Sequence, residues 1–281
     1  MSTNTSSFID PDLMKGVEVF RNILKKARAI IALTGAGVSA ESGVPTFRGS
    51  GGLWRTYQAT DLATPQAFRK DPVLVWQFYH YRRELVFSKS PNPAHEALAR
   101  FEKECKSSGK QFTLITQNVD GLHQRAGSEN VIELHGSLYK VRCTECNVIS
   151  DNHNSPVCAG LAKETTSLDE LPHCGRPGCG GLLRPHIVWF GESLEPEVIE
   201  KARKALDNCD CCLVVGTSSV VYPAAMFAPE LARRLVPVAE FNIQTTPETG
   251  NFQFVFQGPA GDRITANFSI CNCTKIPAKQ S

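Results

Sequence analysis

Two close pairs of cysteines in the middle of the chain are the first residues that could do chemistry. They are Cys143 with Cys146, and Cys174 with Cys179. Two such pairs can supply four thiolates to a tetrahedral zinc ion, and four protein ligands leave no open position for catalysis. We therefore predict a structural zinc ion, because the surrounding segment has little apolar pattern from which to build a core. Buried reduced cysteines are the alternative, and Cys158 or His173 could substitute as a ligand.

A glycine-containing turn follows a short apolar run at residues 29–33. It reads Thr34-Gly35-Ala36-Gly37-Val38-Ser39-Ala40. Glycines allow a tight turn and bring the backbone close to a pyrophosphate, which amides at the start of a following helix would face. The acidic residue that dehydrogenases carry about 20 positions later is not clear. The turn thus predicts a nucleotide-phosphate site but does not favour hydride transfer, and a plain strand-to-helix turn is the alternative.

A polar segment and a histidine form the third group of candidates. Gln117-Asn118-Val119-Asp120 directly follows an apolar run, where parallel sheets bind ligands, and its amide and carboxylate could hold a carboxamide such as nicotinamide. Helix capping by Asn118 is the alternative. His135 could accept a proton near pH 7, although a lone histidine is more often structural.

Apolar runs and helical patterns alternate around these residues. Strands are expected at 29–33, 112–115, 211–215 and 237–241, and helices at 13–23, 72–87, 93–105, 196–206 and 222–235. This order predicts an α/β fold with a Rossmann-like parallel sheet covered by helices on both faces. Residues 47–66 are expected to form a long loop. The predicted organisation is an N-terminal tail (1–12), a sheet domain (13–141 and 184–260), a small inserted zinc-binding module (142–183) and a C-terminal tail (261–281).

The overall composition argues against several classes of protein. The 281 residues carry a formal net charge of +2, which does not favour nucleic acid as a partner. No apolar run approaches the ~20 residues of a membrane-spanning helix, so no membrane partner is expected. Eleven cysteines without a secretory segment predict reduced thiols and metal ligands. Residues 1–10 lack the arginines of a complete transit peptide.

Six segments, in this order, resemble the sirtuin family. They are residues 35–48, Thr116 to Asp120, His135-Gly136, the paired cysteines, Pro185 to Glu192, and Gly216 to Ser218. The resemblance covers residues of roughly 15 to 260. It implies an enzyme that uses NAD to remove acyl groups from protein lysines, giving nicotinamide and a 2'-O-acyl-ADP-ribose.

The resemblance also implies roles for individual residues. His135 would be the catalytic base, and the backbone of Val188, Phe190, Gly191 and Glu192 would pair with a substrate peptide as an added strand. The residues implied to bind NAD are Gly35, Ala36, Gly37, Ser39, Ala40, Glu41, Pro45, Thr46, Phe47, Arg48, Trp54, Gln117, Asn118, Val119, Asp120, Gly216, Thr217, Ser218, Asn242, Ile243, Gln244 and Ala260.

The segment Tyr79-His-Tyr-Arg82 resembles the branch of the family that removes succinyl, malonyl and glutaryl groups and deacetylates weakly. Tyr79 and Arg82 share one face of a predicted helix, and a guanidinium with a phenol can hold a carboxylate. Ala59 would be the small residue that leaves room for the acyl group. An ordinary sirtuin deacetylase or ADP-ribosyltransferase remains the alternative. A zinc-ribbon module that binds nucleic acid would need a basic, aromatic-bearing face on 142–183, which has few such residues.

The resemblance implies a monomer that acts on acylated-lysine proteins in mitochondria, and also in the cytosol and nucleus.

Three features depart from the family pattern. The stretch Asn147 to His173 is short, Ala260 stands where a cysteine is expected, and the tail after Gly261 has no counterpart.

Overall fold

The computed structural model describes residues 11–46, 52–163 and 166–267, and its centre is a six-stranded parallel sheet. In sheet order the strands are β11 (Phe254–Gln257), β10 (Val238–Asn242), β9 (Cys211–Val215), β1 (Ala29–Thr34), β4 (Gln111–Thr116) and β5 (Val131–Glu133). The four strands predicted from apolar runs are confirmed. The outermost strands, β5 and β11, were not predicted because both are short and neither is fully buried.

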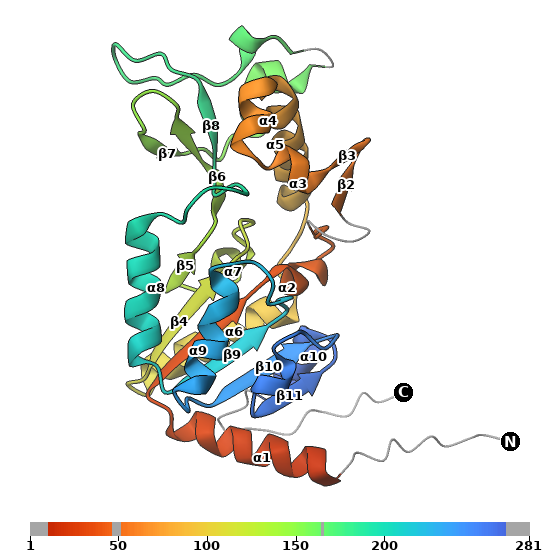
Figure 1. Cartoon of the computed structure of the whole chain (residues 1–281), viewed down its shortest axis with the longest axis vertical. Helices are drawn as coiled ribbons and strands as arrows, with labels where there is room; N and C mark the ends of the chain where they lie inside the picture. Colours follow the sequence, from red (N-terminus) through yellow and green to blue (C-terminus); the bar gives the residue numbers. More distant parts are fainter. Residues whose placement is uncertain (1–10, 47–51, 164–165, 268–281) are drawn as a thin grey trace, which may run out of the picture.

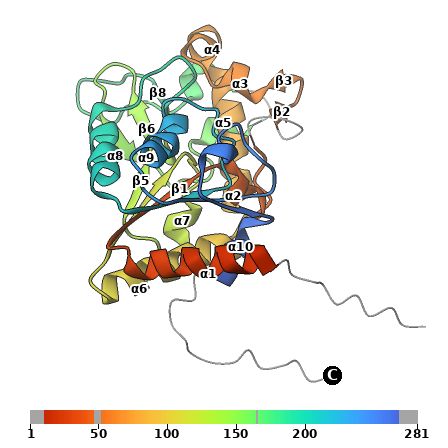
Figure 2. The same cartoon turned by 60° about the horizontal axis from the view of Figure 1, so that its bottom comes forward.

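Helices cover both faces of this sheet (Figures 1 and 2). Ile30 and Ala32 of β1 point to one face, and Ile31 and Leu33 to the other, as expected for successive residues of a strand. The first face is covered by α1 (Pro11–Lys26), α6 (Pro93–Ser107) and α10 (Ala260–Asn267). The second is covered by α8 (Pro196–Asn208), the 3-10 turn η4 (Ala224–Met226) and α9 (Phe227–Arg233). We call this layered unit the sheet domain.

The expected tail begins later than the sequence suggests. Residues 260–267, assigned mostly to a patternless tail, form α10, and Ile264 is fully buried against α6 and the sheet. Two backbone amides at the start of α10, those of Ala260 and Gly261, donate to the carboxylate of Glu41. The helix was not predicted because it is short and has one large apolar side chain, Ile264, which is too few to give a helical pattern in the sequence.

A second unit lies above the sheet domain in Figure 1. Its antiparallel sheet contains β7 (Ile149–Asp151), β6 (Gly136–Cys143) and β8 (Leu183–Ile187). The same hydrophobic core includes a hairpin of β2 (Leu53–Trp54) and β3 (Tyr57–Gln58), and the helices α3 (Ala59–Leu62), α4 (Pro65–Lys70) and α5 (Pro72–Phe87). We call this unit, the described part of 53–87 and 136–190, the small domain.

The small domain is therefore larger than the predicted insert. The boundaries inferred from sequence assigned residues 53–87 to the sheet domain, but Trp76 and Tyr79 of α5 belong to the same hydrophobic core as Val157 and Leu161 of the insert. An apolar pattern shows that a helix is buried without showing which partner buries it. The expected loop at 47–66 is also partly wrong, since its described residues include β2, β3 and α3.

Local signals explain where the long helices begin. The Asp71 carboxylate accepts from the Leu74 amide at the start of α5, and the Asn92 side chain caps α6 in the same way. Proline follows each cap, where its missing amide hydrogen costs nothing. In the described part of the chain, no helix has the length and apolar character needed to cross a membrane.

Candidate active site and zinc centre

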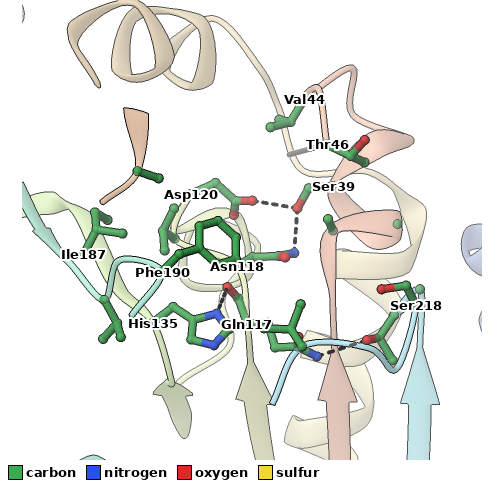
Figure 3. A pocket seen from close by; sticks show the side chains of 18 of the residues that line it. Ser39, Val44, Thr46, Gln117, Asn118, Asp120, His135, Ile187, Phe190 and Ser218 are labelled. Carbon is green, nitrogen blue, oxygen red and sulfur yellow. Dashed lines mark hydrogen bonds between the residues drawn. The ribbon is translucent and has the colours of Figure 1, made fainter. Parts of the chain in front are cut away.

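A cleft of about 740 Å³ lies between the two domains, at the carboxyl ends of β1, β4 and β9. Figure 3 shows side chains from both domains pointing into it. In open α/β sheets this edge is the usual place for a ligand, at the point where successive strands are added to opposite sides. Here β4 lies on one side of β1 and β9 on the other, so the cleft occupies that position.

The turn after β1 packs tightly on the turn after β9. The Gly37 amide donates to the Gly216 carbonyl oxygen at 2.7 Å, and a Cβ added at Gly37 would lie 2.7 Å from that oxygen. A Cβ added at Gly35 would clash with Thr217 at 2.7 Å. The glycines thus allow the two turns to touch, a requirement that the glycine pattern in the sequence does not reveal. Gly37, Gly216 and Thr217 line the cleft.

Asn118 and Asp120 are held in place through Ser39 (Figure 3). The Ser39 hydroxyl donates to the Asp120 carboxylate at 2.7 Å, and the Leu122 amide donates to its other oxygen. The Asn118 side-chain nitrogen donates to Ser39 Oγ at 2.9 Å and to the Gly35 carbonyl at 3.0 Å. Burial raises the pKa of Asp120, although these donors favour the charged form. With both amide hydrogens used, the oxygen of Asn118 is the side-chain atom left for a ligand.

His135 lies between β5 and β6 with one ring nitrogen fixed. Its Nδ1 lies 3.0 Å from the Gln117 carbonyl oxygen, which can only accept, so Nδ1 carries the hydrogen and Nε2 carries the lone pair. Burial lowers the pKa of His135, which keeps the ring neutral near pH 7. Gly136 follows with φ of 81°, and a Cβ there would lie 2.1 Å from the His186 carbonyl oxygen. The imidazole is therefore arranged as a proton acceptor.

One end of the cleft is formed by residues after β9 and β10. The Asn242 side-chain nitrogen donates to the Thr217 carbonyl oxygen at 2.7 Å, joining the two turns. The loop from Gln244 to Pro247 also lines the cleft. It is tied down by buried Glu240, whose carboxylate accepts from the Thr246 and Thr249 hydroxyls.

The opposite end contains Tyr79 and Arg82 from α5. Both side chains are buried and both line the cleft. The Tyr79 hydroxyl accepts from Trp189 Nε1 at 2.8 Å, and Arg82 donates to the Pro45 carbonyl at 3.2 Å. Ala63 lines the cleft here, whereas the expected Ala59 is outside its lining.

The two alanines lie at opposite ends of the same single turn of helix. Ala59 is buried in the core of the small domain at the start of α3, whereas Ala63 lies just after α3 and lines the cleft. The sequence does not show which side of so short a helix faces the cleft.

The segment expected to pair with a peptide also borders the cleft. Val188, Phe190, Gly191 and Glu192 all line it. The Val188 amide donates to the His135 carbonyl oxygen and the Phe190 amide to that of Ala63, both at 2.9 Å. These two amides hold the segment in place and are therefore not offered to a peptide.

Most of the residues expected to bind NAD meet in this cleft. Those that line it are Ala36, Gly37, Ser39, Pro45, Thr46, Gln117, Asn118, Val119, Asp120, Gly216, Thr217, Ser218, Asn242 and Gln244. Six others lie outside its lining: Gly35, Ala40, Glu41, Trp54, Ile243 and Ala260. Phe47 and Arg48 lie outside the described residues.

The six have other positions in the fold. Glu41 binds the amides that begin α10, where Ala260 is buried, and Trp54 belongs to the core of the small domain. Gly35 packs on Thr217, while Ala40 and Ile243 are exposed. The apolar walls were not predicted: Val44 and Ile187 lie within quoted segments but were given no role, and Val86, Leu138, Leu194 and Val221 lie in no quoted segment.

The four predicted zinc ligands meet at the far end of β6 and β8. The sulfurs of Cys143, Cys146, Cys174 and Cys179 lie within 4.8 Å of one another. Those of Cys143 and Cys179 are 3.5 Å apart, and those of Cys146 and Cys174 are 3.8 Å apart. Sulfurs about 2.3 Å from a zinc ion lie about 3.8 Å apart at tetrahedral corners. The four thiols therefore fit a zinc ion.

The other described cysteines, and the histidine considered as a substitute ligand, are not part of this group. Cys158 donates to the Glu170 carbonyl, and His173 Nδ1 bonds to that of Leu171. All nine described cysteines are free of disulfides, and Cys211 and Cys212 belong to the cores of the sheet domain.

Known proteins resemble the chain in sequence and in fold. The model of the Sir2 family matches residues 35–223. A dog (Canis lupus familiaris) protein named NAD-dependent protein deacylase sirtuin-5, mitochondrial, is 56% identical over 87% of this chain and 82% of its own length. A Daphnia pulex protein named NAD-dependent protein deacylase is 60% identical over 88% and 94%. A solved Sir2 homolog–NAD complex has a TM-score of 0.80 at 44% identity, covering 89% and 92%. The chain therefore belongs to the Sir2 family.

Proposed function

We propose that this protein uses NAD to remove acyl groups from protein lysines, and that it prefers acyl groups that end in a carboxylate. The observation that carries the proposal is the presence of Tyr79 and Arg82 in the same cleft as His135. The names of the dog and Daphnia relatives support an NAD-dependent protein deacylase. The dog protein's name also supports a mitochondrial location, and we propose acylated-lysine proteins as the substrates.

The cleft has the groups that this chemistry needs. When bound, NAD supplies a ribose carbon that accepts the acyl oxygen as nicotinamide departs. We propose that Asn118 and Asp120 bind the nicotinamide carboxamide, since Ser39 fixes both side chains. His135 Nε2 would take the proton from a ribose hydroxyl, because Gln117 holds Nδ1 as the donor. The zinc ion, away from the cleft, would have a structural role.

The acyl end explains the proposed preference. A succinyl, malonyl or glutaryl group carries a carboxylate into a buried site, where an ion without a partner would be costly. The Arg82 guanidinium and the Tyr79 hydroxyl supply charge-assisted donors for it. An acetyl group offers these donors no carboxylate, so it gains nothing from them.

The test compares kcat/KM for succinyl-lysine and acetyl-lysine peptides in the parent protein and in Arg82→Met. We expect the parent to prefer succinyl, and Arg82→Met to lose roughly 100-fold on succinyl while its acetyl activity changes little. Arg69→Met, an exposed arginine in α4, is the matched control and should keep the parent preference.

Two outcomes would contradict the proposal in different ways. A parent that prefers acetyl would refute the acidic-acyl preference while leaving the deacylase activity intact. An Arg82→Met variant that loses both activities equally would show that Arg82 serves the shared machinery instead of acyl selection.

A further inference from the structure

A hydrogen bond between two buried aromatic side chains lies at the acyl end of the cleft. Tyr79 and Trp189 are 0% and 2% exposed, and Trp189 Nε1 donates to the Tyr79 hydroxyl oxygen at 2.8 Å. Their ring centroids are 6.3 Å apart. The two side chains come from different parts of the small domain, α5 and the segment after β8. Their contact fixes the tyrosine relative to the segment that borders the cleft.

The direction of this hydrogen bond decides what the tyrosine can do. An indole nitrogen can only donate, whereas a phenol has one hydrogen to donate and lone pairs to accept. Tyr79 must therefore be the acceptor from Trp189, and its own hydrogen points elsewhere. Burial raises the pKa of Tyr79 well above its usual value, so the hydroxyl keeps that hydrogen. A hydroxyl that accepts one hydrogen bond also becomes a stronger donor in the next.

Trp189 is itself held on two sides. The Arg184 guanidinium carbon lies 3.5 Å from the centroid of the Trp189 ring, in a cation–π contact. Arg184 binds both oxygens of Glu192, at 2.6 and 2.9 Å. The Trp189 amide donates to the same carboxylate at 2.9 Å. The indole thus has a fixed place from which to orient Tyr79.

We infer that Trp189 is a positioning residue for acyl selection. Its indole N–H occupies the Tyr79 oxygen as donor, so that the Tyr79 hydrogen is directed to the carboxylate of the acyl group. This inference rests on the proposed function. Without the indole donor the Tyr79 hydroxyl is free to turn, and its hydrogen bond to the substrate carboxylate weakens.

The test is Trp189→Phe, which keeps an aromatic ring but removes the N–H. Trp76→Phe is the matched control, because Trp76 is equally buried in the small domain and its Nε1 donates at 2.8 Å to the Leu183 carbonyl instead of to Tyr79. Tyr79→Phe and the double variant complete the set. For each, kcat and KM are measured with succinyl and acetyl peptides, and Tm is recorded.

The expected result is a change in selectivity. Trp189→Phe should lower the succinyl-to-acetyl ratio of kcat/KM about 5–10-fold, mainly through the KM for the succinyl peptide. Trp76→Phe should lower Tm without changing the ratio. In the Tyr79→Phe background, Trp189→Phe should change the ratio less than about 2-fold, because the hydroxyl it orients is already gone.

If Trp189→Phe is too unstable to assay, benzothienylalanine at position 189 replaces the N–H by sulfur with nearly the same shape and should give the same loss. A ratio that is unchanged in either variant would overturn the inference. The inference would also be overturned if the double variant lowered the succinyl-to-acetyl ratio by the product of the two single effects. A parent with no preference for succinyl would instead refute the proposed function, and the two failures are therefore distinguishable.

Discussion

Arg82 and Arg83 are adjacent in α5, yet Arg82 lines the cleft while Arg83 joins α5 to β6 and to the segment after β7. The Arg83 guanidinium donates to the carbonyl oxygens of Leu138, Asn152 and Asn154. Neighbouring residues of a helix point about 100° apart, so two arginines in sequence can meet different surroundings. One arginine faces the proposed acyl site, and the other holds the domain that borders it.

Arg83→Met should therefore affect stability and leave acyl selectivity intact. The substitution removes a buried cation that satisfies several carbonyl oxygens, and we expect unfolding to become easier by about 3 kcal/mol. The measurements are urea unfolding and the succinyl-to-acetyl ratio of kcat/KM. Arg82→Met is the matched control and should show the reverse pattern, with a large change in selectivity. A changed ratio in folded Arg83→Met would contradict this division of roles.

The proposed role of His135 predicts how activity depends on pH. Burial lowers the pKa of this imidazole, and a base must be unprotonated to accept a proton. Activity should therefore be flat near pH 7 and fall as the pH drops through a pKa below 6.5, the usual value for histidine. The measurement is kcat/KM against pH with saturating NAD.

His135→Gln should lower kcat by roughly 100-fold or more at every pH. His153→Gln, at an exposed position, is the control and should keep the parent profile. An acidic limb centred above pH 6.5, or a His135→Gln variant with near-parent kcat, would show that another group accepts the proton.

The four-cysteine cluster predicts one zinc ion that the small domain needs in order to fold. Cys174→Ser removes one of the four grouped sulfurs, whereas Cys158→Ser, in the same domain, removes a sulfur outside the group. Metal analysis should find about one zinc per chain in the parent and in Cys158→Ser, and much less in Cys174→Ser. Because the insert shares its core with α5, loss of zinc should lower Tm and abolish deacylation. A metal-free Cys174→Ser with parent Tm would contradict a structural role.

The sequence is informative where a strand or motif is determined by its own residues. β1 and β9 were predicted because runs buried on both faces stay apolar throughout, and Gln117 to Asp120 could be placed at a ligand-binding edge because β4 is parallel. The partners of an element depend on tertiary packing instead. For that reason α5 was predicted with correct bounds but not with its packing partners in the insert, and Ala59 was expected where Ala63 lines the cleft.

Glu240 gives a prediction for the end of the cleft where we propose that NAD binds. This carboxylate is 1% exposed and accepts from Thr246 Oγ1 at 2.8 Å and Thr249 Oγ1 at 2.5 Å. It holds the loop after Asn242, which lines the cleft beyond the turns of β1 and β9. Glu240→Gln replaces one charged acceptor by an amide, which weakens both hydrogen bonds and loosens the loop.

We expect Glu240→Gln to raise the KM for NAD about 3–10-fold with little change in kcat, and to destabilise the fold by about 1–2 kcal/mol. Glu248→Gln is the matched control, because it makes the same change in the same loop at a carboxylate whose bond to Asn251 is exposed. Its KM for NAD should equal that of the parent. An equal rise of KM in both variants would mean that loop charge, and not the buried clamp on Thr246 and Thr249, sets the affinity for NAD.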